Sequence, residues 1–200
     1  CLISYEDNIV MQLIFGDPYY DSEDWDEHQY LNELEGWLRE YDESLQLHHV
    51  DTGHGADFPA ILVEFFDSLD WKVVSASSVA GVFMLGDKIN KNLEAWIAIG
   101  KKLSSLIEKC KPTRVSEDAA VCWVINELTS QEVPLQDLDI RLQVIQFSKG
   151  PRKSNLKLEA NPDCLYIITV QTSDKVFVYG LKSNLKVEFK REFDTAWHEF

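Results

Sequence analysis

The first 70 residues of this 200-residue chain contain almost no basic side chains. Arg39 stands alone there against 18 acidic residues, which gives a net charge of −17. A surface this acidic repels phosphate groups, so the N-terminal half is not expected to bind DNA or RNA. It suits a basic protein partner, simple solubility, or self-association through the basic segment 141–191, which contains 10 bases and 4 acids.

Long apolar runs and paired cysteines are also missing. Apolar stretches such as 81–85 are far shorter than the roughly 18–20 residues of a membrane-spanning helix, so no membrane span is expected. The four cysteines show no CxxC spacing, so we expect neither a zinc cluster nor a disulfide framework, which favours a reduced, cytoplasmic protein. Because the sequence begins with Cys1 and shows no signal segment, we expect a processed or trimmed N-terminus. A lipoprotein is the alternative, although the predicted first strand would leave it little tether.

Apolar periodicity predicts a β-α-β unit in the N-terminal region. A run of β-forming residues at 8–18 predicts a buried strand. The following segment, capped by Asp21 or Ser22, predicts an amphipathic helix. Residues 45–51 predict a second strand, reached by a right-handed crossover if the two strands are parallel. The apolar stripe of the helix is formed by Leu31, Leu34, Leu38 and Tyr41, with Tyr30 and Trp37 beside them.

Helices are predicted through the middle of the chain. Asp57 is placed to cap a helix at 58–69, because Pro59 is tolerated only in a first helical turn. A longer helical region is predicted from 71 to 111, where Pro112 ends it. A short helix capped by Ser116 follows.

From Leu138 onward the apolar period changes to two and predicts four strands. Their sequences are DIRLQVIQF, CLYIITVQT, KVFVYGL and LKVEFKREF. The third is apolar on both faces and is therefore expected to be central, whereas the fourth alternates and is expected to be half exposed. The predicted fold class is α+β, with an N-terminal β-α-β unit, a helical middle and C-terminal antiparallel strands packed as a sheet against helices. We expect one domain over 1–200, or a subdivision into 1–111 and 112–200.

The most concentrated reactive side chains lie in the sequence HHVDTGHGAD at 48–57. Successive side chains of a strand point to opposite faces, so His48 and His49 are not expected to share an ion. His49 and Asp51 share a face, and His54 could fold back from the glycine loop to complete a metal site with two nitrogens and one oxygen. No HExxH spacing fixes such a site, so a structural loop is the preferred interpretation and no cofactor is expected.

The segment LNELEGWLREYDESLQLHHVDTGHGADFPAILVEFF resembles the effector-associated constant component domains of bacterial conflict systems. The matching features are Trp37–Glu40, Glu43, Gly53, Gly55 and the small-residue segment Ser75–Gly86. The loop lacks the proline-rich character of the family, and the four strands from Leu138 exceed the compact family domain. The resemblance covers the first half of the chain and implies a non-enzymatic adaptor, encoded beside a separate effector, with no catalytic residues to carry over.

Two functions from different classes follow. The preferred one is a bacterial cytoplasmic interaction module that presents an acidic surface around 17–43 to a basic partner or to a second copy. The alternative is a metal-assisted hydrolase that uses His49, Asp51 and His54. The expected binding residues of the interaction module are Asp21, Glu23, Asp24, Asp26, Glu33 and Glu40.

Overall fold

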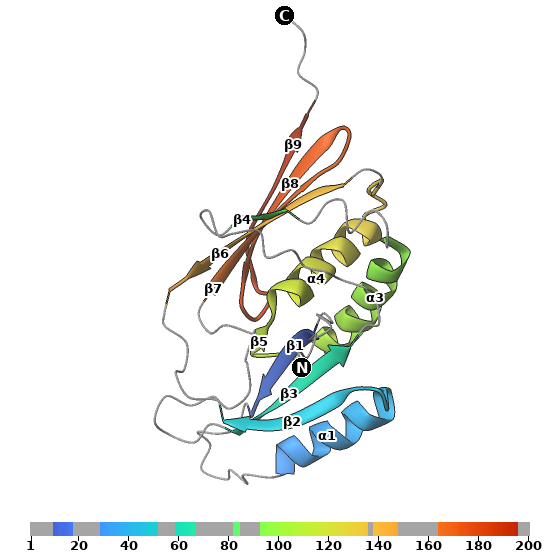
Figure 1. The fold of residues 1–200 in the computed structure, drawn as a ribbon, viewed down its shortest axis with the longest axis vertical. Coiled ribbons are helices and arrows are strands. Elements are labelled where there is room, and N and C mark those ends of the chain that lie inside the picture. The colour runs from blue at the N-terminus through green and yellow to red at the C-terminus, as the bar shows by residue number, and fades with distance from the viewer. Residues whose placement is uncertain are drawn as a thin grey trace, which may run out of the picture.

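The structure is a computed structural model that describes residues 10–17, 29–51, 59–66, 82–84, 93–135, 138–147 and 164–195 (Figure 1). The described chain has the predicted α+β class, with helices between two antiparallel sheets. The elements are β1 (Val10–Gly16), α1 (Gln29–Tyr41), β2 (Gln46–Asp51), β3 (Pro59–Phe66), β4 (Val82–Met84), α3 (Leu93–Cys110), β5 (Arg114–Val115), α4 (Glu117–Ser130), β6 (Asp139–Gln146), β7 (Cys164–Gln171), β8 (Lys175–Lys182) and β9 (Val187–Asp194).

The first sheet has the strand order β2-β3-β1-β5, and β3 is antiparallel to both of its neighbours. β1 and β2 therefore run in the same direction, but β3 lies between them. The helix predicted at 58–69 is wrong, because its described part, Pro59–Phe66, is a central strand of this sheet. The run Ala60–Val63 is buried on both faces, and a continuous apolar run fits such a strand as well as a buried helix. Pro59 is the first residue of the strand, where proline is tolerated.

The predicted helical region at 71–111 is confirmed at 93–110 and wrong at 82–84. α3 occupies Leu93–Cys110 and ends before Pro112, as expected. Val82–Met84 instead forms β4, which pairs with β6 in the second sheet. Pairing with β6 here outweighs the helical pattern of the sequence. Residues 67–81 and 85–92 lie outside the described parts.

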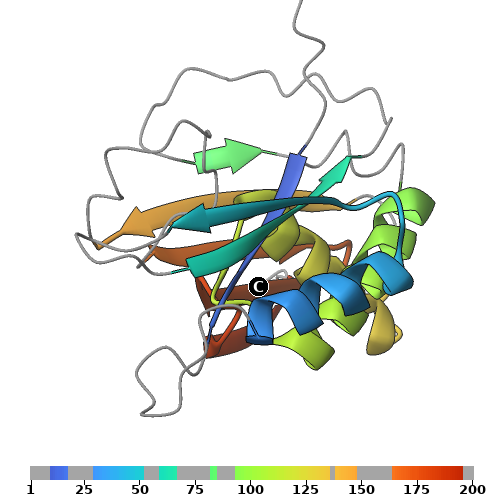
Figure 2. The same cartoon turned by 90° about the horizontal axis from the view of Figure 1, so that it is seen from below.

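α1 confirms the predicted amphipathic helix from Gln29 onward, whereas its predicted caps, Asp21 and Ser22, lie outside the described residues. Leu31, Leu34 and Leu38 are buried in the core that it shares with the first sheet, and its aromatic residues pack at the margin of this core. The rings of Trp37 and Tyr41 stand 5.2 Å apart. α1 also lies beside α3 (Figure 2). The ammonium of Lys109 on α3 lies 3.8 Å from the centroid of the Trp37 ring.

α4 lies between the two sheets and is buried along most of its length (Figure 1). Its first cap residue is Ser116, as predicted, but the Ser116 side chain makes no capping hydrogen bond. The hydroxyl instead accepts a 3.0 Å hydrogen bond from the backbone N–H of Gln12 on β1. The residue that begins α4 therefore also fastens the helix to the first sheet.

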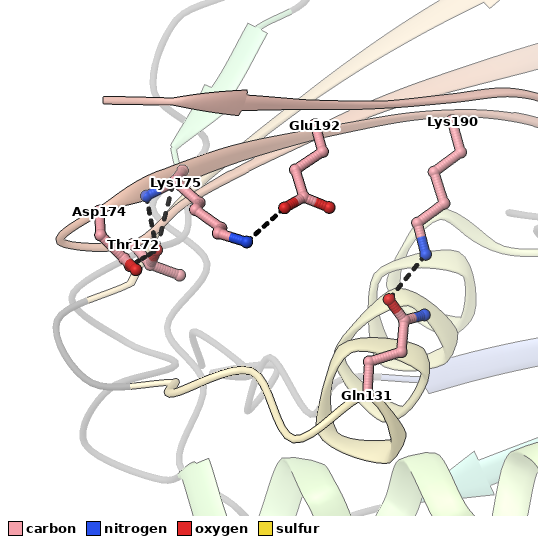
Figure 3. Close-up of polar contacts among 6 residues, drawn as sticks. All are labelled: Gln131, Thr172, Asp174, Lys175, Lys190 and Glu192. Carbon is pink, nitrogen blue, oxygen red and sulfur yellow. Dashed lines mark hydrogen bonds and ion pairs between the residues drawn. The ribbon is translucent and has the colours of Figure 1, made fainter. Parts of the chain in front are cut away.

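The second sheet has the order β4-β6-β7-β8-β9, and the four predicted C-terminal strands are confirmed. β8 is internal and β9 is a largely exposed edge strand, with a register shift opposite Gly180 and Leu181. On the helix side of this edge, Lys190 donates a 2.8 Å hydrogen bond to Gln131 at the end of α4, and Lys175 pairs with Glu192 across β8 and β9 (Figure 3). The edge is thus anchored to the helical layer.

The two sheets meet at β5. This strand pairs with β1, yet the N–H of Val115 donates to the carbonyl of Ser183 in the β8–β9 turn at 2.7 Å. The Tyr166 hydroxyl donates to the Val115 carbonyl at 2.6 Å. β5 therefore joins both sheets through buried hydrogen bonds. Among the described helices, none is long and apolar enough to cross a membrane.

Candidate functional site

The two histidines of β2 engage different carboxylates. His48 Nε2 lies 3.1 Å from Glu64 Oε2 on β3, whereas His49 Nε2 lies 2.8 Å from Glu35 Oε2 on α1. The side chains therefore leave β2 on opposite faces, as strand alternation requires. This geometry agrees with the expectation that His48 and His49 do not share an ion.

Glu35 joins α1 to β2. Arg39, one helical turn later, donates hydrogen bonds of 2.7 and 3.0 Å to Glu35 Oε1. The hydrogen bond from Arg39, followed by that with His49, lowers the pKa of the Glu35 carboxyl below its ordinary value. An ionised carboxylate therefore pairs with His49 in an exposed contact between α1 and β2.

The other members of the predicted metal set are not brought together in the described chain. Asp51 ends β2 and is exposed, and His54 lies outside the described residues. No group of three or more His, Cys, Asp or Glu side chains in the described ranges has the arrangement of a metal site. Within these ranges His49 pairs with Glu35 and belongs to no such group.

A polar cluster on the other face of the first sheet was not predicted. Gln12 Nε2 on β1 donates a 2.8 Å hydrogen bond to Glu64 Oε1, and Glu64 Oε2 pairs with His48. Gln12 is only 3% exposed, and Ile14 and Leu62 on the same face are fully buried. Polar residues inside apolar strands gave a hint of such a cluster, but their pairing depends on the register of β1, β2 and β3. The contacts satisfy a partly buried carboxylate and hold three strands in register.

The exposed acids of α1 form the best-defined candidate interaction surface. Glu33 and Glu40 are exposed and two helical turns apart, about 10 Å along the axis at 1.5 Å per residue, and exposed Glu43 follows the helix. We call Glu33, Glu40 and Glu43 the acidic face of α1. Within the described ranges none of the three takes part in an ion pair, and Glu33 accepts a hydrogen bond only from Gln29, at 3.1 Å. The other predicted binding residues, Asp21, Glu23, Asp24 and Asp26, lie outside these ranges.

A pocket of about 670 Å³ lies at the junction of the two sheets. Its described lining consists of Thr113 and Arg114 at β5, Phe147 after β6, Cys164 at the start of β7, and the β8–β9 turn at 182–184. These segments are far apart in the sequence, so no local motif pointed to the pocket. The only sequence signal was the excess of basic residues after 141.

A comparison of the chain with protein families, curated proteins and solved structures finds no match. Among the described residues, two features bear on function: an acidic helix face and a pocket with basic walls.

Proposed function

We propose that the protein is a non-enzymatic interaction module that presents the acidic face of α1 to a basic protein. The observation that carries this proposal is the contrast between two sets of carboxylates in one region. Three carboxylates have partners within the chain. Glu35 contacts Arg39 and His49, and Asp42 pairs with Lys102. Glu64 contacts Gln12 and His48. The acidic face of α1 is left exposed, without ion pairs in the described chain.

Unpaired surface charge acts mainly on the rate of encounter. At ordinary salt, the attraction between exposed charges is largely screened beyond about 8–10 Å. Glu33 and Glu40 are about 10 Å apart along the helix, so each of them attracts a different basic group of one partner. Complementary charge speeds association more than it slows dissociation. The net charge of −15 for the whole chain adds long-range attraction for a basic protein.

The acidic face also stands on a rigid element. α1 is held by its three buried leucines, and the Tyr41 hydroxyl donates to the carbonyl of Lys102 on α3 at 3.2 Å. The carboxyl of Asp42 pairs with the ammonium of the same lysine. A surface that is already ordered loses little conformational entropy on binding, which favours a preformed docking face.

The resemblance of the N-terminal half to effector-associated constant component domains supports a more specific version of the proposal. In that version the protein is a cytoplasmic adaptor of a bacterial conflict or immunity system. The metal-assisted hydrolase is not proposed, because the described residues bring together no group of three possible metal ligands.

A charge-neutralised pair of variants tests the acidic face. We expect Glu33→Gln with Glu40→Gln to reduce the association rate of a fluorescent lysine- and arginine-rich peptide by about 3- to 10-fold at low salt. The matched control is Glu94→Gln with Glu108→Gln, which makes the same charge change at exposed positions of α3. Stopped-flow measurements over a salt series compare the two. Equal rates for both double variants would show that only the net charge matters, and the proposal would fail.

Light scattering over the same salt series identifies the kind of partner. An oligomer that dissociates to a monomer as salt rises supports self-association, with the basic segment 141–191 of one copy meeting the acidic face of another. A monomer at every salt concentration leaves the acidic face for a different protein.

A further inference from the structure

The walls of the pocket are fixed by the backbone hydrogen bonds that join the two sheets. The N–H of Ser183 donates to the carbonyl of Cys164 at 3.2 Å, and the carbonyl of Ser183 accepts from Val115 at 2.7 Å. The Thr113 hydroxyl donates to the carbonyl of Ile14 at 2.9 Å. The pocket is therefore already formed, and a ligand would not have to order its walls.

The charge of the pocket is opposite to that of the protein. Its described lining contains two basic residues, Arg114 and Lys182, and no acidic residue. Arg114 is half-buried, so its charge is only partly screened by water. The hydroxyl of Ser183 and the amide of Asn184 add neutral polar groups. In a chain with a net charge of −15, the described lining of this pocket is therefore locally basic.

An aromatic side chain stands at the same site. Phe147 lines the pocket and is 68% exposed, an unusual setting for a large apolar residue. A flat apolar group placed against its ring would remove part of that surface from water. The volume of about 670 Å³ falls within the range of roughly 300–1,000 Å³ that is typical of small-molecule sites.

We propose that this pocket binds a small organic anion in which a phosphate or carboxylate group is attached to an aromatic ring. Arg114 and Lys182 meet the anionic group, and Phe147 contacts the ring. Arginine is suited to this role because its planar guanidinium can donate two parallel hydrogen bonds to either kind of anion.

Glu188 competes with the ligand for Lys182. Its Oε1 lies 2.9 Å from Lys182 Nζ, and Glu188 is exposed outside the described lining of the pocket. The hydrogen bond from Lys182 lowers the pKa of the Glu188 carboxyl. An incoming anion therefore has to share Lys182 with Glu188 or replace Glu188 as its partner. Removing the Glu188 carboxylate should strengthen anion binding, and removing the Lys182 ammonium should weaken it.

Calorimetric titration with naphthyl phosphate tests the proposal, with naphthol as the ring alone and inorganic phosphate as the anion alone. We expect naphthyl phosphate to bind more tightly than either part. Naphthoate distinguishes a carboxylate ligand from a phosphate ligand, and tight binding of either aryl anion supports the site. Lys182→Gln should weaken the aryl anion about tenfold, as expected for loss of a charge-assisted hydrogen bond, and Glu188→Gln should tighten it.

Two controls match the variants in residue type. Lys186→Gln makes the same charge change at an exposed position that does not line the pocket, and should leave affinity nearly unchanged. Phe147→Ala should weaken binding about 2- to 10-fold through the lost ring contact, whereas Phe193→Ala, at another exposed phenylalanine, should not. Thermal melts establish that each variant is folded. The proposal is overturned if naphthyl phosphate binds no better than inorganic phosphate, or if Lys182→Gln and Lys186→Gln behave alike.

Discussion

Replacing a helical glycine by alanine is expected to have opposite effects at Gly36 and Gly100. Gly36 lies on the exposed side of α1, where an added Cβ would meet nothing within 4 Å. Alanine restricts the unfolded chain and favours the helix, so Gly36→Ala should stabilise the protein by about 0.5–1 kcal/mol.

At Gly100 the same change meets a neighbouring helix. A Cβ on this α3 residue would lie 2.9 Å from the backbone oxygen of Cys122 and 3.0 Å from Cβ of Asn126, both on α4. Backbone atoms of a buried helix cannot move aside cheaply, and overpacking of this kind costs about 1–3 kcal/mol. Because the gain in helix propensity is common to both variants, their stabilities should differ by this packing cost alone.

Urea unfolding followed by far-UV circular dichroism measures the difference. The slope of the free energy of unfolding against urea should be the same in both variants, so that a change in midpoint reports stability. If Gly100→Ala stabilises the protein as much as Gly36→Ala does, α3 and α4 are not in the close contact described above. The position of α3 matters for function because Lys102 and Lys109 on this helix hold α1.

Three further predictions concern the N-terminal half. Leu34→Ala should lower the free energy of unfolding by about 2–5 kcal/mol because the side chain is buried, whereas Glu33→Lys and Glu40→Lys should change it by less than about 0.5 kcal/mol. If urea unfolding shows comparable losses for all three variants, the buried and exposed faces of α1 are wrongly assigned. The lowered pKa of Glu35 stabilises the protein above its ordinary value of 4.5, and this contribution is lost as the pH falls through the lowered pKa, so Glu35→Gln should flatten the stability profile below pH 4.5; an unchanged acid-unfolding curve would contradict this. Elemental analysis of protein purified without added metal should find no stoichiometric zinc, manganese or iron. About one metal ion per chain that is lost in His49→Ala would instead favour the metal-assisted hydrolase.

Sequence periodicity predicted the elements whose two faces differ. The stripe that contains Leu34 and Leu38 located α1, and the alternation of apolar residues located the C-terminal strands. It failed at β3, where Ala60–Val63 is apolar on every side, so that a period of two cannot be distinguished from a period of 3.6. Pro59 then favoured the wrong element, since proline suits the start of a helix and the start of a strand alike.

The candidate sites were predictable only as far as local geometry reaches. Strand alternation alone indicated that His48 and His49 diverge. Their partners, Glu64 and Glu35, could not be predicted, because one depends on the register of β2 against β3 and the other on the position of α1. The pocket at the junction of the sheets depends on four separate segments, and nothing in the spacing of its residues indicated that they meet.

The composition of β9 limits how copies of this protein can assemble. Within the described chain no strand lies beyond β9, and its free backbone groups could template a strand from another molecule. Five of the eight residues of β9 (VEFKREFD) are charged. The register shift at Gly180 and Leu181 also makes the pairing of β8 with β9 irregular. β4, at the opposite edge, is only three residues long. Neither edge of the second sheet favours its growth from molecule to molecule, so copies of the protein are not expected to assemble into a ribbon by extending this sheet.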